Sequence, residues 1–135
     1  MNPSEPSAVV RVVDDDEDFR TAIARLLRAL GYSVRTYSSA SEYLNSQDDD
    51  ARGCILLDVH MPVMGGLDLS PVLARRANAL PIILMSGSGE VWDAAKVAEA
   101  GAIFLLSKLI DQRDLVQAIS IALAADRPST RDPGE

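Results

Sequence analysis

The sequence predicts an α/β fold in which parallel strands alternate with helices around one buried sheet. Short runs rich in aliphatic and β-branched residues recur five times, and a segment with helical spacing of apolar residues follows each run. Several runs are continuously apolar, which is typical of strands that helices cover on both faces. Five strand–helix pairs in alternation therefore predict a doubly wound, five-stranded parallel sheet with five helices.

Length and composition fit one domain of this kind. The chain has 135 residues, of which 47% are hydrophobic, and this is enough to bury a core without metal or disulfide support. The formal net charge of −7 argues against direct nucleic-acid binding, because phosphate contacts need a basic face. The single cysteine, Cys54, can form no internal disulfide and is expected to be an inert buried thiol. No apolar run could span a bilayer and the N-terminus shows no signal-peptide pattern, so we expect a cytoplasmic protein without membrane contact.

The first strand and helix follow from the start of the chain. The β-branched run Ala8–Val13 predicts the first strand. The first helix is expected to begin inside the acidic run Asp14–Asp18, since acidic residues complement the helix dipole, and to close at Gly31. The dipole does not explain the first two acids of that run, which belong to the end of the strand.

The next segments predict a second strand–helix pair and the central strand. Tyr32–Tyr37 alternates as a strand does, and Ser38–Ser39 precede a short helix. The acidic triplet Asp48–Asp50 is interpreted as a solvated loop. Three aliphatic residues then lead into a carboxylate in Ile55–Asp58, which predicts a buried parallel strand. The pair Gly65–Gly66 is expected to form a loop after that strand.

The third helix, fourth strand and fourth helix follow in order. Asp68 is expected to cap the third helix, with Pro71 in its first turn, where a missing amide proton costs little. The apolar run Pro81–Met85 predicts the fourth strand, and an alanine-rich stretch over roughly Glu90–Ala100 predicts the fourth helix, closed by Gly101. The predicted inward stripe of that helix consists of Val91, Ala94, Ala95 and Ala98.

The C-terminal part completes the predicted domain. Ala102–Leu106 is the fifth strand, and an apolar pattern from Leu115 to Leu123 marks the last helix. Residues 126–135 are polar and proline-containing, so we expect a disordered tail or the start of a linker. Residues 1–7 are a comparable lead-in. A single domain over residues 8–125 remains, without internal repeats.

Polar side chains stand at four of the predicted strand ends. Asp14 and Asp15 follow the first strand, Asp58 the third, Ser86 the fourth and Lys108 the fifth. Because the strands are parallel, these side chains collect at one edge of the sheet, where α/β proteins bind their ligands.

These residue types suit phosphoryl transfer onto a carboxylate. Three neighbouring carboxylates repel one another unless a cation joins them, and Mg²⁺ prefers such hard oxygen ligands. A carboxylate beside Mg²⁺ can act as a nucleophile toward phosphorus and form an acyl phosphate. A lysine and a serine hydroxyl, together with the metal, would neutralise the charge of the transferring group.

At these positions the sequence resembles the receiver domains of two-component response regulators. The resemblance covers roughly residues 8–125 and rests on several short motifs in one order and spacing. The segment after the fourth strand is most similar to receivers that precede helix-turn-helix output domains. The matching motifs are Val-Val-Asp14-Asp15, Leu-Leu-Asp58-Val-His-Met-Pro62-x-Met-Gly-Gly, Leu-Met-Ser86-Gly, Gly101-Ala102 and Lys108.

The resemblance implies a flavodoxin-like fold with strand order 2-1-3-4-5 and a role as a molecular switch that is not an enzyme in the usual sense. It implies that a partner histidine kinase phosphorylates Asp58, and that Asp14, Asp15, Asp58 and the backbone carbonyl of His60 hold Mg²⁺. Ser86 and Lys108 would bond the phosphoryl group. A homodimer through the fourth helix, fifth strand and fifth helix is a further expectation.

Two departures from the family pattern concern the end of the fifth strand. The family usually has proline after the lysine, joined by a cis peptide, whereas Leu109 follows Lys108 here. A cis bond before a non-proline residue costs about 2.5–4 kcal/mol, so we expect a trans bond and a rearranged loop. Leu105 occupies the place of the usual switch aromatic, and its neighbour Phe104 would face the other side of the sheet.

Two further side chains near this edge have open interpretations. His60 lies in a loop beside the acceptor, so we expect it to line the site and, with Ser88, to tune phosphate lifetime rather than to act catalytically. Trp92 is either a lone exposed aromatic or a contact residue for a partner or a second copy of the chain, and we favour the role as a contact residue.

Two other functions remain open from the sequence. The first is a degenerate receiver that serves only as a protein-interaction module, which Leu109 favours and the complete set of polar residues disfavours. The second is a small Mg²⁺-dependent phosphatase with an aspartyl nucleophile. Such enzymes place a second acid two residues after the nucleophile, where this chain has His60.

Overall fold

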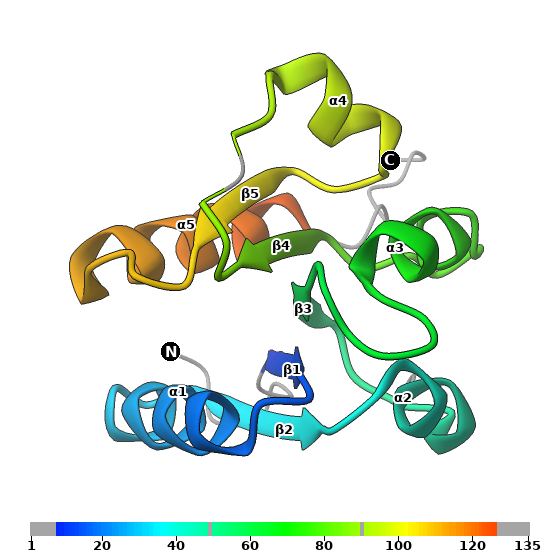
Figure 1. Cartoon of the computed structure of the whole chain (residues 1–135). Coiled ribbons are helices and arrows are strands. Elements are labelled where there is room, and N and C mark those ends of the chain that lie inside the picture. The colour runs from blue at the N-terminus through cyan, green and yellow to red at the C-terminus, as the bar shows by residue number, and fades with distance from the viewer. Residues whose placement is uncertain (1–7, 49, 90, 127–135) are drawn as a thin grey trace, which may run out of the picture.

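Five strands run parallel in the order β2-β1-β3-β4-β5, which confirms the predicted sheet (Figure 1). The computed structural model describes residues 8–48, 50–89 and 91–126. Within these ranges the strands are β1 (Val9–Val13), β2 (Ser33–Tyr37), β3 (Gly53–Asp58), β4 (Ile82–Ser86) and β5 (Phe104–Ser107). The helices are α1 (Glu17–Ala29), α2 (Ala40–Ser46), α3 (Gly66–Ala74), α4 (Ala94–Glu99) and α5 (Gln112–Ala125).

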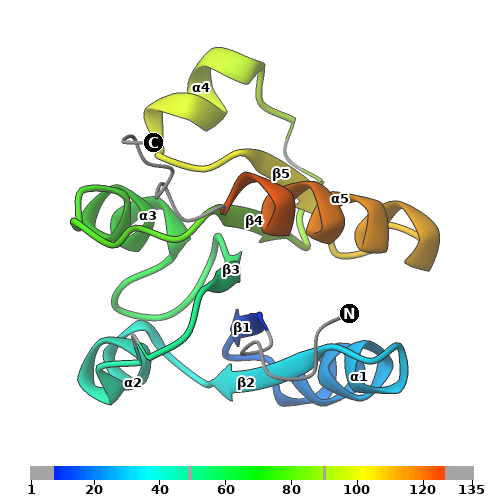
Figure 2. The same cartoon turned by 180° about the vertical axis from the view of Figure 1, so that it is seen from behind.

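Helices cover both faces of the sheet, so the two faces form two apolar clusters. Figures 1 and 2 show α1 and α5 on one face and α2 and α3 on the other. On the α1–α5 face, Val10 of β1 packs with Leu27 and Ile119 of the helices. On the opposite face, Leu57 of β3 packs with Leu69 of α3. The central strands β1, β3 and β4 are buried on both faces, which explains their continuous apolar runs.

The first helix begins where its sequence predicts. Asp16 is the N-cap of α1, and its carboxylate accepts a hydrogen bond from the backbone N–H of Phe19. Gly31 lies just after the helix with a φ of +99°, a conformation that suits glycine at a C-terminal cap.

The third helix begins earlier than predicted. Its N-cap is Gly65, so Asp68 lies within the first turn and does not cap the helix. Pro71 consequently lies inside the helix rather than in its first turn. Close packing explains the early start, because a Cβ atom on Gly66 would lie 2.7 Å from the carbonyl oxygen of Asp58. Only glycine allows α3 to begin so near the end of β3.

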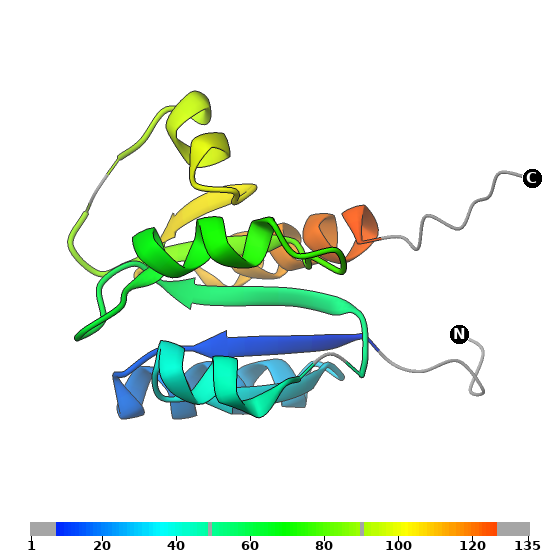
Figure 3. The ribbon, with the colours of Figure 1, turned by 90° about the vertical axis from the view of Figure 1, so that its right-hand side faces the viewer.

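The fourth helix is shorter than predicted and turns a different side inward. It begins after the N-cap Asp93, and only its Val97 is buried. The predicted stripe of Val91, Ala94, Ala95 and Ala98 is wrong, because all four residues are exposed. Figure 3 shows α4 standing away from the layer that α3 forms. Residue 90, the predicted start of this helix, lies outside the described residues.

Two acidic residues that the sequence assigns to solvent are buried. The side chain of Asp48 is 3% exposed because it pairs with Arg11 of β1, so the predicted solvated loop is wrong for this residue. Asp50 is exposed as predicted, and residue 49 lies outside the described residues. The side chain of Asp126 is also buried and belongs to the domain rather than to a tail. The predicted lead-in of residues 1–7 and the rest of the tail, 127–135, lie outside the described residues. Among the described residues, no helix is long and apolar enough to cross a bilayer.

Candidate functional site at the carboxyl edge of the sheet

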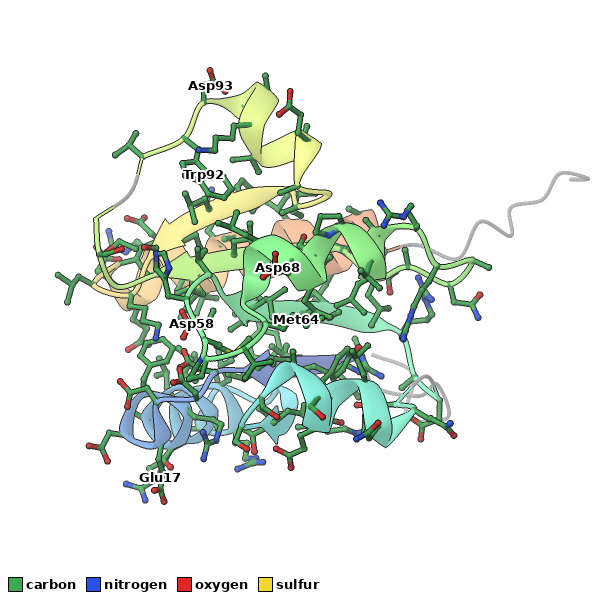
Figure 4. All side chains as sticks on the ribbon, turned by 45° about the vertical axis from the view of Figure 1, so that its right-hand side comes forward. Glu17, Asp58, Met64, Asp68, Trp92 and Asp93 are labelled. Carbon is green, nitrogen blue, oxygen red and sulfur yellow. The ribbon has the colours of Figure 1, made fainter. Side chains whose placement is uncertain are left out.

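The sheet brings the predicted polar residues to one edge. Asp14 directly follows β1, Asp58 ends β3, Ser86 ends β4, and Lys108 directly follows β5. Figure 4 shows Asp58 where β3 runs into the loop before α3. Asp58 and Ser86 belong to the fully buried strands β3 and β4, and Asp14 directly follows buried β1, so the backbone at the site is held by the core.

Three carboxylates form a compact cluster at this edge. Asp14, Asp15 and Asp58 each offer one oxygen, and these oxygens lie within 4.8 Å of one another. Asp14 and Asp58 are buried, whereas Asp15 is exposed. Backbone amides orient the two buried groups, because the N–H of Asp16 donates to Asp14 Oδ1 at 2.9 Å and the N–H of His60 donates to Asp58 Oδ1 at 3.2 Å.

Lys108 supplies the cation of this cluster. Its Nζ lies 2.8 Å from Asp14 Oδ2 and 3.4 Å from Asp58 Oδ2. The ring of Phe19 lies beneath the ammonium group, with its centroid 4.7 Å from Nζ. Burial acts to lower the pKa of Lys108, but the bond to Asp14 and the charges of both carboxylates raise it, so the side chain stays charged.

The environment of Asp58 disfavours its ionised form. Burial and then the nearby charge of Asp14 raise the pKa of the Asp58 carboxyl to about 7, although Lys108 acts in the opposite direction. A second cation near the carboxylates would offset this cost. The site therefore concentrates negative charge beyond what one lysine neutralises.

The cluster fits a magnesium ion by the chemistry of its donors. Three carboxylates from the ends of two neighbouring strands provide hard oxygen ligands, and one of them, Asp15, is open to solvent. Mg²⁺ favours such partial protein coordination because it retains several waters. The carbonyl of His60, the fourth predicted ligand, belongs to the residue whose N–H already contacts Asp58.

Ser86 lies beside a second serine at the end of β4. Ser86 is buried, and its Oγ lies 3.2 Å from Ser88 Oγ and accepts a hydrogen bond from the N–H of Ser88. The backbone carbonyl of Ser86 accepts from the N–H of Lys108 at 2.9 Å. This bond ties the serine and lysine positions of neighbouring strands together.

The loop after Lys108 has the predicted trans geometry. No cis peptide bond occurs among the described residues, which include the Lys108–Leu109 pair. The Leu109 N–H, which a proline would lack, donates to Ser107 Oγ at 3.0 Å, and the Leu109 residue is 91% exposed. Despite the missing proline, Lys108 points into the acidic cluster.

The aliphatic residue at the switch position and its neighbour face opposite sides of the sheet. Leu105 packs against the cluster on the α3 face, and Phe104 packs against the α1–α5 face, as the alternation of strand side chains predicts. Trp92 is half-buried against the same cluster as Leu105, and Figure 4 places it between α4 and β5. The Lys96 ammonium lies 4.6 Å from its ring centroid, so Trp92 is not a lone exposed aromatic.

Sequence reasoning missed the contact between Phe19 and the cationic group of the site. Its position in the apolar pattern of α1 indicates only a core residue, and Phe19 does pack against the core. The pairing with Lys108 joins residues 89 positions apart, so only the folded sheet edge reveals it.

Comparison with known protein families gives one match over most of the chain. Residues 10–120 match the family described as "Response regulator receiver domain". Among curated proteins, the chain is 42% identical over 123 residues to the response regulator protein TmoT of Ectopseudomonas mendocina, covering 91% of this chain and 55% of that protein. It is 36% identical over 121 residues to the transcriptional regulatory protein TdiR of Thauera aromatica, covering 90% and 53%. The chain spans about half the length of these relatives.

Solved structures give the same result. The response regulator StyR superposes with a TM-score of 0.80 at 32% identity, covering 90% of this chain and 61% of that one. A structure named FixJ-N superposes with a TM-score of 0.78 at 30% identity, covering 89% and 96%.

Proposed function

Since the chain belongs to the response regulator receiver domain family, we propose that Asp58 is its phosphoacceptor and that the domain works as a phosphorylation-dependent switch. One observation carries this proposal. Asp58 is a buried carboxylate with two further carboxylates and a lysine ammonium converging on it. A structural carboxylate needs one cation partner, so the two further carboxylates support a role in which a second cation and a transferred anionic group bind here.

The chemistry follows from the positions of the chain's own groups. A carboxylate oxygen of Asp58 attacks phosphorus, and the bond from phosphorus to the donor's nitrogen or oxygen breaks, with its electron pair leaving on the donor. Lys108 Nζ, 3.4 Å from Asp58, is placed to neutralise charge on the phosphoryl oxygens, and Ser86 Oγ is a donor for another of them. Bound Mg²⁺ would supply charge neutralisation between Asp14, Asp15, Asp58 and the carbonyl of His60.

The proposed phosphoryl donor is a sensor histidine kinase, because the relatives are response regulators. In this scheme the domain is a regulatory partner in the cytoplasm rather than an enzyme acting on free substrates. Relatives named as transcriptional regulators, including a DNA-binding one, are about twice as long or longer, so a DNA-binding output would lie outside the part that matches. The acidic charge of this chain supports a receiver that does not itself grip DNA.

A homodimer through α4, β5 and α5 is the proposed assembly. β5 is an edge strand, and the apolar residues Ile103 beside it and Ile121 on α5 are 40% and 47% exposed. Exposed apolar residues beside a sheet edge favour pairing with a second surface.

Intact-mass measurement after incubation with acetyl phosphate and Mg²⁺ tests the phosphoacceptor. The wild-type protein should gain one phosphoryl group, and Asp58→Ala should gain none. Beryllofluoride binding, followed by NMR on both proteins, detects a competent site even where the acyl phosphate hydrolyses quickly. Absence of both the adduct and beryllofluoride binding would favour the phosphate-independent interaction module, the alternative that the exposed, non-proline Leu109 supports.

A further inference from the structure

Three arginines of α1 line a hollow whose residues do not include the carboxylates of the proposed phosphorylation site. The hollow measures about 280 Å³ and lies between α1 and the edge strand β2, which run side by side in Figures 1 and 2. Its floor includes buried Ala24, and its rim carries two hydroxyls. The lining residues are Arg20, Thr21, Ala24, Arg25, Arg28 and Thr36.

Two of these guanidinium groups are held in place by backbone carbonyls. Arg20 Nη1 donates to the carbonyl oxygen of Asp14 at 2.7 Å, and Arg28 Nη2 donates to that of Val34 at 3.0 Å. A neutral carbonyl uses one of the five donors of a guanidinium and leaves its charge uncompensated. The remaining N–H donors are therefore preorganised rather than freely rotating.

No carboxylate forms an ion pair with any of the three arginines within the described ranges, whereas Arg11, Arg35 and Arg52 are all paired. Glu42 on α2 is an acidic group whose pKa is affected by the charge of Arg20. Its pKa is lowered mainly by hydrogen bonds from the N–H and hydroxyl of Ser38, both of which go to Oε1, and less by the charge of Arg20. The hollow thus keeps excess positive charge in a chain whose net charge is −7.

The spacing along the helix concentrates that charge further. Arg25 and Arg28 are three positions apart, so their side chains are neighbours on the helix surface and repel each other. Arg20 and Arg28 are eight positions apart, on either side of Ala24 in one i, i+4 row of α1. An anion beside Arg25 and Arg28 would relieve their mutual repulsion and accept hydrogen bonds from their unused donors.

We propose that this α1–β2 pocket binds an oxyanion of phosphoryl size, either free or as the terminal group of a nucleotide. Guanidinium forks and threonine hydroxyls are suited to phosphoryl oxygens, because arginine can bond two of them at once. The volume lies just below the usual range for pockets that enclose a whole drug-sized ligand, so the pocket takes the anionic group and leaves the remainder in solvent.

This site is independent of the proposed phosphorylation of Asp58. Arg20 contacts the main-chain carbonyl of Asp14, whose side chain points instead to Lys108. Binding to the α1–β2 pocket should therefore persist in Asp58→Ala, so failure of one proposal leaves the other standing.

NMR titration tests the proposal directly. The ¹⁵N-labelled protein, free of Mg²⁺, is titrated with inorganic phosphate, pyrophosphate, AMP or ADP while the arginine Nε–H signals and backbone amides are followed. We expect saturable shifts at Arg20, Arg25, Arg28 and Thr36, and higher salt should weaken them. Equal affinity for pyrophosphate and ADP identifies the phosphoryl group alone as the ligand, and tighter ADP binding adds contacts to the nucleoside.

Matched charge variants decide whether the arginines carry the binding. Arg25→Gln/Arg28→Gln should weaken pyrophosphate binding by roughly tenfold or more, because it removes two charged donors. Arg75→Gln/Arg113→Gln removes the same charge from exposed arginines elsewhere and should leave the affinity unchanged. The single variant Arg25→Gln touches an exposed side chain and tests the site should the double variant fold poorly.

Three results would overturn the proposal. One is the absence of saturable shifts with every phosphoryl compound. Another is equal loss of affinity in the pocket and control variants, which would indicate diffuse charge attraction. The third is that the NMR signals of the pocket residues shift with polyglutamate but not with the phosphoryl compounds. This result would identify an acidic protein surface as the partner instead.

Discussion

At the scale of single residues, Asp48 organises a buried charge network at the β2 side of the sheet. Both of its oxygens bond Arg11, whose side chain is fully buried, at 2.9 Å. Arg35 and the hydroxyl of Tyr37 also contact Asp48. Burial, followed by the bond to Asp48, raises the pKa of Tyr37 to about 12, so the phenol remains a donor at neutral pH. One carboxylate thus holds two guanidiniums and one hydroxyl.

Replacing Asp48 should destabilise the domain strongly. Asp48→Asn leaves the buried guanidinium of Arg11 without a counter-charge, and breaking a buried pair in this way costs about 3–5 kcal/mol. Urea unfolding followed by circular dichroism gives the free energy of unfolding. Asp50→Asn is the matched control, because Asp50 is exposed and its ion pair with Arg35 lies at the surface, so a much smaller loss of stability is expected. Equal losses in both variants would contradict a central role for Asp48.

Asp58 should make the metal-free domain less stable as pH rises toward neutrality. Its folded pKa of about 7 exceeds the unfolded value of ~3.9, so between these values the folded state holds a proton that the unfolded state has lost. The free energy of unfolding therefore falls through this window, and Asp58→Asn should remove that contribution. Urea unfolding at several pH values with a chelator measures both slopes. Parallel profiles for the two proteins would show that Asp58 ionises normally.

The sequence identifies the site residues better than it identifies their partners. Asp14, Asp58 and Ser86 directly follow or end apolar runs, so the strand pattern alone places them at one edge of the sheet. The burial of Asp48 could not be predicted in this way, because it depends on Arg11, a charged residue inside a strand 37 positions earlier. Its neighbours in the chain are polar and give no sign of that contact.

At the scale of elements, the end of α5 is fixed to the start of β3. Asp126 Oδ2 accepts a hydrogen bond from the buried N–H of Gly53 at 2.8 Å, and the same carboxylate pairs with Arg52. Arg52 also donates to the carbonyls of Asn78 and Ala79 in the loop after α3. Three elements therefore meet at the edge of the sheet opposite to the acidic cluster.

Removing this contact should loosen the C-terminal helix. Asp126→Ala leaves the Gly53 N–H buried without a partner, which costs about 1–3 kcal/mol. Hydrogen exchange should show faster exchange at Gly53 and in the last turn of α5. Arg52→Met keeps the amide bond and should cost less than Asp126→Ala. The reverse order would mean that the surface ion pair, rather than the buried amide, fixes the helix.

The fourth helix shows where periodicity gives too little information. Alanines dominate its sequence, so several helical faces are about equally apolar and the pattern cannot identify the inward one. Tertiary contacts decide, because Val97 is buried and Ser70 of α3 donates to the carbonyl of Ala100 at 2.6 Å. Strands were predicted more reliably, because burial on both faces makes them uniformly apolar.

At the scale of the whole molecule, the loops at one edge of the sheet carry the proposed chemistry and the packed layers carry the stability. A cation at the acidic cluster links the two, because it binds the folded state in which the loops are assembled. Such binding stabilises the fold in proportion to the logarithm of the ligand concentration.

Magnesium should accordingly raise the melting temperature of the domain. The thermal midpoint should increase with Mg²⁺ concentration in the wild-type protein, and Asp15→Asn should shift this dependence to higher concentrations. Asp15 is exposed, so its replacement should leave the metal-free midpoint nearly unchanged. Differential scanning calorimetry at several Mg²⁺ concentrations measures both. An identical Mg²⁺ response in the variant would exclude Asp15 as a ligand.

The central strand β3 joins two distant events in one short segment. Its last residue is the proposed acceptor Asp58, and its first, Gly53, anchors the end of α5. Five residue steps of a strand span roughly 17 Å, about twice the distance over which salt screens a surface charge in physiological solution. A module attached beyond residue 126 would thus experience almost none of the electrostatic field of the phosphoryl group through the solvent. Phosphorylation must therefore act on such a module through displacement of the helices that pack along the strand.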